Sequence, residues 1–167
     1  MTIVSRKGDQ GKSYWLNKAV DKDDLLLEAI GTIDELQCTL GVAKAEIGGE
    51  YLKTEIESIQ KDLWSIAGRL AGYNRKTNTK LVDLGKRVKE MEMEISEWEK
   101  DLPTIRDFTL PGINKKEALL QLCRSVIRKV ERRLVSLSKR DRVDVKILPY
   151  LNRLSDYLFV LAQQAIK

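Results

Sequence analysis

The N-terminal stretch SRKGDQGKSYW, residues 5–15, concentrates residue types that bind anions. Its Gly-Lys-Ser at 11–13 looks like the end of a P-loop, but a P-loop needs a glycine five positions before Gly11, where this chain has Arg6. What remains is a cationic, hydroxyl-bearing loop whose glycines allow close backbone approach to a phosphate. The alternative is a mobile, solvated chain end.

A second group of polar residues lies within apolar helical patterns near the C-terminus. Its members follow the spacing i, i+4, i+7 twice, as Arg124, Arg128 and Glu131 and then as Asn152, Asp156 and Phe159. This spacing places each set on one helix face. Arginine binds carboxylates and phosphates equally well, so the stripe could brace helices or hold a nucleotide. An ordinary solvated face with local ion pairs is the alternative.

The segment GTIDELQ adds a carboxylate to these candidates. Gly31 precedes Asp34 in a helical pattern, and glycine there is useful where backbones or ligands come close. Burying Asp34 would require a cation. An arginine of the 115–140 segment is the candidate partner.

Composition restricts the chemistry further. The 167 residues include no histidine, which excludes histidine-based triads, imidazole-ligated zinc and an imidazole general base. The net charge of +5 fits an anionic ligand, whereas a nucleic-acid binder would show a denser basic face with interleaved aromatics. Cys38 and Cys123 have apolar neighbours, so we expect reduced core thiols rather than a disulfide or a metal pair.

No apolar run approaches the length of a membrane span, and the N-terminus lacks a secretory pattern. We therefore expect a cytoplasmic protein that contacts no membrane and no nucleic acid. The chain length suits a single domain.

A period of 3.6 residues dominates after Asp21 and predicts five helices. Their expected ranges are 23–47, 51–73, 79–102, 115–140 and 143–166. Pro149 falls early in the last of them, where it sits in the first turn or kinks the helix. No strand alternation, internal repeat or low-complexity tract is evident. Short connections predict an all-α, antiparallel five-helix bundle over 22–167, preceded by a flexible loop over 1–21.

Five motifs, in order, resemble the propanediol-utilisation type of ATP:cob(I)alamin adenosyltransferase. They are SRKGDQGKS, similar to the family's T-K-x-G-D-x-G-x-[ST]; KDDLLLEAIGTIDELQ, similar to K-D-D-x-x-x-E-A-x-G-T-x-D-E-L; FTLPG, similar to F-x-L-P-G; CRSVIRKVERR, similar to A-R-x-x-x-R-R-A-E-R; and YLNRLSDYLFVLA, similar to Y-L-N-R-L-S-D-x-L-F-x-x-A. Residues 51–101 match only as generic helix.

The resemblance implies a homotrimer of ferritin-like five-helix bundles that binds ATP between neighbouring subunits. It implies a nucleotide-binding set that consists of Ser5, Arg6, Lys7, Gly8, Asp9, Gly11, Ser13, Tyr14, Lys22, Arg128, Glu131, Arg132 and Asn152. Arg128 would also act in catalysis. Asp34 and Arg124 would form an interhelical ion pair beside the corrinoid, and Phe108 would press against the lower face of the corrin ring.

The reaction implied by the resemblance is attack of Co(I) in cob(I)alamin on C5′ of ATP, which gives adenosylcobalamin and triphosphate. Co(I) is a strong nucleophile, so no general base is required, in agreement with a chain that lacks histidine. Mg²⁺ would be held mainly by the phosphates rather than by protein ligands. A Co(II) reductase and a cobalamin-dependent mutase are the expected partners.

Two other functions remain open from the sequence. One is a nucleotide-dependent corrinoid chaperone that delivers the cofactor to a mutase without fast turnover. The other is a basic helical adaptor for nucleic acid. Departures from the family pattern stand at Ser5, Arg6, Leu26, Ile113, Gln121, Lys129 and Val130. Leu26 replaces a frequent arginine and Ile113 replaces the usual second glycine of the linker, so these two departures bear on the loop and corrinoid contacts that the resemblance implies.

Overall fold

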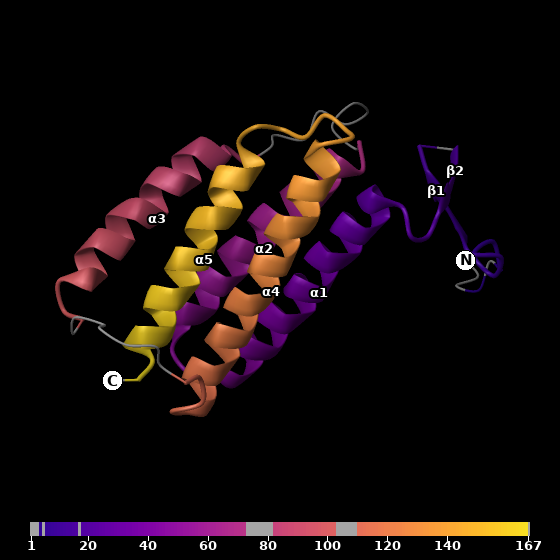
Figure 1. The fold of residues 1–167 in the computed structure, drawn as a ribbon. Coiled ribbons are helices and arrows are strands. Elements are labelled where there is room, and N and C mark those ends of the chain that lie inside the picture. Colours follow the sequence, from indigo (N-terminus) through magenta and orange to yellow (C-terminus); the bar gives the residue numbers. More distant parts are fainter. Residues whose placement is uncertain (1–3, 5, 17, 73–81, 103–109, 167) are drawn as a thin grey trace.

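The computed structural model describes residues 4, 6–16, 18–72, 82–102 and 110–166. Within these ranges five helices form an antiparallel bundle (Figure 1). They are α1 (Leu25–Glu46), α2 (Glu50–Leu70), α3 (Leu84–Glu99), α4 (Lys115–Ser138) and α5 (Ile147–Gln164). The prediction of an all-α, five-helix bundle is confirmed.

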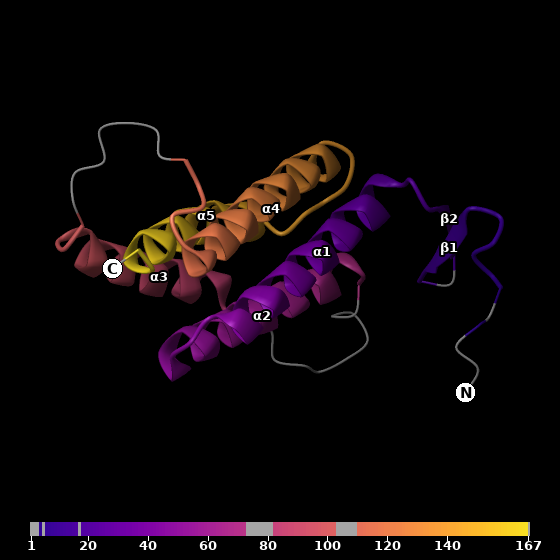
Figure 2. The same ribbon diagram turned by 90° about the horizontal axis from the view of Figure 1, so that it is seen from below.

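The apolar spacing of α1 explains how the helices pack. Leu26, Ala29, Ile33, Leu36 and Leu40 recur every three or four residues and are all buried. This stripe lies against α4 and α2, while α5 packs between α4 and α3 (Figure 2). Burial of such stripes is the main favourable contribution to a helical bundle.

Local sequence signals set the helix ends. Asp24 caps α1, since its side chain accepts a hydrogen bond from the Leu26 N–H at 2.8 Å. The Gly48-Gly49 pair ends α1, and Gly49 adopts a φ of 97° immediately before α2. Pro149 lies in the first turn of α5, where its missing N–H costs no helical hydrogen bond. Of the two alternatives predicted for Pro149, a place in the first turn or a kink in the helix, the first is therefore confirmed.

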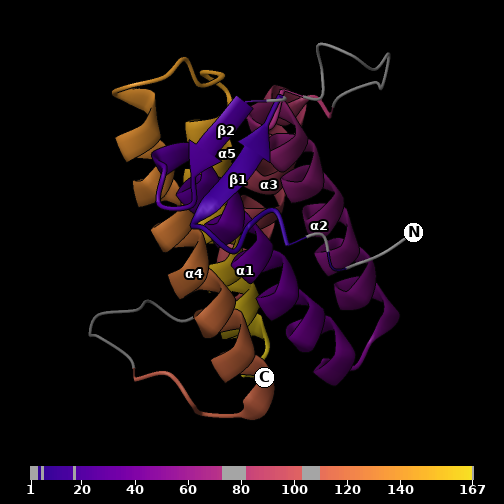
Figure 3. The ribbon, with the colours of Figure 1, turned by 90° about the vertical axis from the view of Figure 1, so that its right-hand side faces the viewer.

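The structure adds two short strands that the sequence pattern did not indicate. Strands β1 (Lys12–Trp15) and β2 (Lys18–Asp21) pair in antiparallel register, with Lys12 opposite Asp21 and Trp15 opposite Lys18. Figure 1 shows this hairpin beyond the N-terminal end of α1, and Figure 3, which looks onto that side, shows it in front of the helices. The Lys12 ammonium and the Asp21 carboxylate form an ion pair across the two strands.

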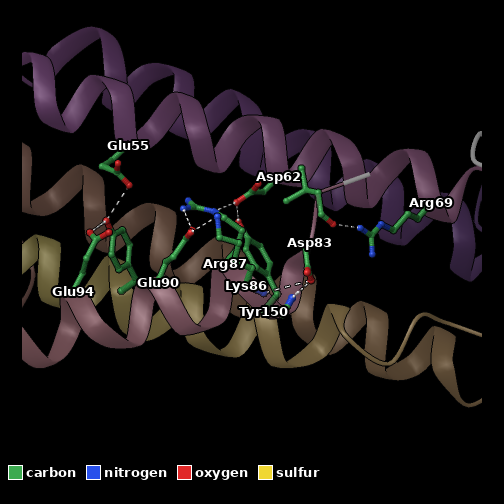
Figure 4. A network of polar contacts seen from close by, with 12 residues as sticks. Glu55, Asp62, Arg69, Asp83, Lys86, Arg87, Glu90, Glu94 and Tyr150 are labelled. Atoms are coloured by element: carbon green, nitrogen blue, oxygen red, sulfur yellow. Dashed lines mark hydrogen bonds and ion pairs between the residues drawn. The ribbon is translucent and has the colours of Figure 1, made fainter. Parts of the chain in front are cut away.

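Polar side chains, rather than apolar ones alone, join α3 to α2 and α5 (Figure 4). Arg87 on α3 donates from Nε to Asp62 on α2 at 2.9 Å and from Nη1 to Glu90 at 2.9 Å. The Tyr150 hydroxyl on α5 also donates to Asp62, at 2.9 Å. Burial, and then the Asp62 carboxylate, raise the pKa of Tyr150 well above its usual value, so the hydroxyl stays a donor.

A second polar contact lies about two helical turns further along the same boundary. The Tyr157 hydroxyl shares its proton between Glu94 at 2.7 Å and Glu55 at 3.1 Å. Its ring packs 5.2 Å from that of Trp98, measured between ring centroids. These contacts fix α3 against α5, which matters because α3 and α5 both line the groove described below.

The two cysteines have different surroundings. Cys123 is buried, and burial raises the pKa of its thiol to about 12. Cys38 is exposed on α1, so the prediction that both thiols lie in the core is wrong for Cys38. In the described part of the chain, no helix combines the length and apolarity needed to cross a bilayer.

Candidate functional site

A groove of about 240 Å³ runs between α4, α5 and the last turns of α3. It is lined by Ile95, Glu99, Arg124, Arg128, Arg153, Ser155, Asp156, Phe159 and Val160. The predicted stripe Arg124–Arg128 and the predicted pair Asp156–Phe159 thus meet along one groove. Helical spacing explains this, because each set lies on one face of its helix and α4 packs directly against α5.

Arg124 occupies the apolar side of the groove. Its Nε donates to Gln121 Oε1 at 2.7 Å, and its guanidinium carbon lies 5.6 Å from the centroid of the Phe159 ring. This is the geometry of a cation–π contact. The arrangement places a fixed positive charge beside a flat apolar ring, which suits a ligand with both anionic and apolar parts.

The polar residues predicted on α5 find their partners nearby. The Asn152 side chain donates to Glu131 Oε1 on α4 at 3.4 Å. Asp156 pairs with Arg153 of its own helix at 2.7 Å, and Arg153 also bridges to Glu92 on α3 at 3.1 Å. Arg128 and Arg132 are exposed and make no ion pair with any residue in the described ranges. Their positive charges are available to an anion.

The predicted phosphate loop is built from successive turns ahead of β1. The N–H of Gly11 donates to the Gly8 carbonyl at 3.2 Å, and the N–H of Lys22 donates to the Gly11 carbonyl at 2.9 Å. Gly11 has a φ of 73°, a conformation that favours glycine. A Cβ atom on Gly8 would lie 3.0 Å from the Lys22 ammonium, so this glycine allows the close approach of Lys22.

The structure therefore brings several N-terminal candidates together at one end of the molecule. Arg6, Lys7, Gly8, Asp9, Gly11, Ser13, Tyr14 and Lys22 all lie in or beside this loop and hairpin. Lys7 is exposed and Tyr14 is 60% exposed, so neither is used by the core. Ser5 and Phe108 lie outside the described residues.

The loop and the groove do not meet within one chain. No residue of the described N-terminal segment lines the groove, and in the view of Figure 1 the hairpin and α3 lie on opposite sides of the bundle. The two halves of the predicted nucleotide site are separate in a single copy.

The predicted ion pair between Asp34 and Arg124 is not formed within the chain either. Asp34 is exposed, and among the described residues it has no ion-pair partner. The neighbouring Glu35 faces α4 instead and pairs with Lys129 at 2.6 Å. Adjacent helical positions differ by about 100° around the axis, so only one of two consecutive carboxylates can face α4.

Sequence reasoning missed three contributors. Glu99 and Arg153 line the groove, and Gln121 orients Arg124. The i, i+3 spacing of Arg153 and Asp156 was a signal that the groove has an internal ion pair. Glu99 gave no such signal, because the proximity of α3 depends on tertiary packing.

Comparisons with known proteins agree with this geometry. The family model "Cobalamin adenosyltransferase" matches residues 3–165. The chain is 36% identical over 167 residues to the corrinoid adenosyltransferase of Bacillus subtilis, covering 98% of this chain and 86% of that protein. It is 34% identical over 170 residues to the corrinoid adenosyltransferase MMAB of Homo sapiens, covering 98% of this chain and 68% of that protein.

A solved structure supports the same relationship. A variant of the PduO-type ATP:corrinoid adenosyltransferase from Lactobacillus reuteri, complexed with cobalamin and ATP, superimposes with a TM-score of 0.89 at 27% identity. The match covers 98% of this chain and 93% of that one. The fold, the order of the motifs and the family model therefore agree, and the chain belongs to the cobalamin adenosyltransferase family.

Proposed function

We propose that this chain is an ATP:corrinoid adenosyltransferase, which transfers the 5′-deoxyadenosyl group of ATP to Co(I) of a reduced corrinoid and releases triphosphate. The observation that carries the proposal is the α4–α5 groove, which aligns two arginines with the Phe159 ring in a chain of this family. ATP and the corrinoid are the substrates.

The side chains have two tasks in this reaction. Negative charge develops on the leaving triphosphate, and Arg128 with Lys22 and the loop amides stabilises it. Mg²⁺ bound through phosphate oxygens would share that task. Mg²⁺ carried by the phosphate oxygens would need few protein ligands, since it retains several waters and substrate oxygens around it. A proton acceptor is unnecessary because the cobalt is the nucleophile.

We further propose that the nucleotide site is completed between copies in a homotrimer. The N-terminal loop and hairpin of one copy would supply Lys7, Gly8 and Lys22. The next copy would supply Arg128 from the groove, and Asn152, one helical turn before Asp156 on α5. The separation of these sets in one chain supports this arrangement. Asp34, exposed on α1, and Arg124 would then pair across the subunit boundary.

Phe108 is proposed to exclude the lower axial ligand from the corrinoid, since an apolar ring there disfavours both that ligand and water. A Co(II) reductase would supply the reduced substrate and a mutase would receive the product. Co(I) chemistry needs reducing surroundings, and the two free thiols are typical of such a compartment, so we place the protein in the cytoplasm.

The direct test is an anaerobic assay with ATP, Mg²⁺ and chemically reduced cobalamin, followed by absorbance. We expect adenosylcobalamin to form, and Arg128→Ala to lower kcat/KM by about 100-fold or more, the scale of losing one charge-stabilising group. The absence of product from the wild-type chain would refute the proposal. Release of adenosylcobalamin without an added mutase would indicate an enzyme, whereas retention of the product until a mutase is added would indicate a corrinoid chaperone.

Mixed oligomers test the shared site. Arg128→Ala removes the groove contribution, and a Lys7→Ala, Lys22→Ala double variant removes the loop contribution. Refolding the two inactive proteins together should restore activity, because some sites then combine an intact loop with an intact groove. A mixture that stays as inactive as its components would show that both halves act within one chain.

A further inference from the structure

Trp15, at the end of β1, fastens the hairpin to the bundle. Its indole Nε1 donates to the carbonyl of Ala71 at 3.0 Å, and its ring packs against the hydrophobic core. Ala71 follows the last residue of α2, so its carbonyl belongs to the set that a helix end leaves without an intrahelical partner. The indole therefore satisfies an acceptor at the end of α2.

The residue after Trp15 adds a close steric contact at the same place. A Cβ atom on Gly72 would lie 3.1 Å from Leu16 Cδ1, and Gly72 has a φ of 76°. Glycine is thus favoured there both by the backbone conformation and by the approach of Leu16. Trp15 and Leu16 together also line a cavity of about 760 Å³ between the hairpin and the bundle.

A second attachment lies at the base of the hairpin. Arg140, just beyond α4, donates through both terminal nitrogens to the two carboxylate oxygens of Asp24, each at 2.9 Å. Asp24 is two residues after Lys22. The base and the turn of the hairpin are therefore fastened to different helices, while the loop before β1 has neither attachment.

We propose that Trp15 is a positioning residue that holds the nucleotide-binding loop at a fixed place relative to its own bundle. The alternation of β1 supports this role, because Ser13 and Trp15 are half-buried whereas Lys12 and Tyr14 point to solvent. Trp15 thus faces the bundle, while Tyr14 on the opposite face of the strand is available to a ligand. The proposal rests on the proposed function, and it adds a residue that acts on ATP binding without touching the nucleotide.

The anchor is first tested without activity, by tryptic cleavage at Lys12 and Lys18. Trp15→Phe keeps an aromatic ring and removes only the N–H donor. Cleavage of the transiently detached hairpin should become about 2- to 12-fold faster, which corresponds to a hydrogen bond of about 0.5–1.5 kcal/mol. Trp64→Phe is the matched control, because Trp64 is 70% exposed on α2.

The functional test uses Trp15→Ala, which removes the ring as well. If the detached hairpin then predominates, only the molecules with an attached hairpin bind ATP well. The apparent affinity for ATP is then the intrinsic affinity multiplied by the fraction of molecules whose hairpin is attached. We expect the KM for ATP to rise at least fivefold, with kcat at saturating ATP and the KM for cobalamin within twofold of the wild type. Trp64→Ala should leave all three constants unchanged.

Two results would overturn the proposal. One is a KM for ATP in Trp15→Ala that stays within twofold of the wild type. The other is a parallel loss in kcat and in both KM values, which would indicate general destabilisation. A wild-type chain without transferase activity would refute the proposed function alone, and the comparison of cleavage rates for Trp15→Phe and wild type would then decide the anchor.

Discussion

Glu117 shows how one buried carboxylate organises the start of α4. Its side chain is 2% exposed and accepts hydrogen bonds from the N–H groups of Gly112 at 2.7 Å and Ile113 at 3.2 Å. The Glu117 N–H in turn donates to the Asn114 side chain at 2.9 Å, which completes a reciprocal cap. Ile113 is 60% exposed, so its side chain is accommodated in solvent where the family pattern has a glycine.

Glu117→Ala should lower the free energy of unfolding by about 1–3 kcal/mol, because two backbone donors lose their acceptor. Glu117→Gln keeps a carbonyl oxygen at the same place and should cost less. Urea denaturation measures both values. Lys116→Ala, at an exposed position in the same turn, is the control. Equal stabilities for Glu117→Ala and Lys116→Ala would contradict the assigned cap.

At the scale of the elements, the boundary between α2 and α3 depends on a charged pair with little exposure. The Arg87 side chain is 19% exposed and that of Asp62 is 4% exposed. Burial acts to lower the pKa of Arg87, but the hydrogen bonds to Asp62 and Glu90 outweigh it and raise that pKa above its usual value. The guanidinium is therefore charged at every accessible pH.

Arg87→Met should reduce the free energy of unfolding by about 3 kcal/mol, the lower end of the range for removing one partner of a buried ion pair. The reason is that it leaves the Asp62 carboxylate buried without a cation. The double variant Asp62→Asn, Arg87→Met should recover part of that loss, because asparagine carries no charge and keeps an acceptor for the buried Tyr150 hydroxyl. Thermal and urea unfolding of the single and double variants give the comparison. A double variant no more stable than Arg87→Met would show that the pair is not the source of the loss.

The helices could be predicted closely because their signals are local. The apolar spacing of α1, the Gly48-Gly49 pair and the Asn114 cap each act within a few residues, and observed ends lie within a few residues of predicted ones. The hairpin could not be predicted in this way, because strands of four residues show little alternation. Its attachment through Trp15 also depends on α2, which is distant in the sequence. The roles of Asp62 and Glu117 were missed for the same reason, since a carboxylate in an apolar pattern does not identify its distant partners.

The candidate site was predictable in part. The helical spacing of Arg124, Arg128, Asp156 and Phe159 was sufficient to place them along one groove. The sequence could not predict whether Asp34 or Glu35 faces α4, because that choice depends on the rotation of α1 about its axis. That rotation is set by the whole core rather than by the motif.

At the scale of the whole molecule, Asp24 and Arg140 connect the N-terminal segment to the connection between α4 and α5. The hydrogen bonds from Arg140, and then the one from the Leu26 N–H, hold the pKa of Asp24 below its usual 3.8. A lowered pKa in the folded state means that the ion pair stabilises the protein above pH 3.8 and that this contribution is lost as pH falls below it.

Asp24→Asn tests this contribution, because asparagine caps helices as well as aspartate does. At neutral pH the wild type should be more stable by less than about 1 kcal/mol, since the pair is partly exposed to water. The difference should disappear as pH falls below 3.8. Denaturation curves between pH 7 and about pH 3 measure it. A difference that does not change with pH would show that the charge of Asp24 is not involved.

The hairpin also has a consequence for the behaviour of concentrated protein. A sheet of two strands has an outer edge on each side, and bare edges invite strands of other molecules to add on. Lys12, Lys18 and Asp21 place charges along these edges. The same residues that surround a ligand-binding loop therefore also act as gatekeepers against self-association, and neutralising them would favour fibrous aggregates.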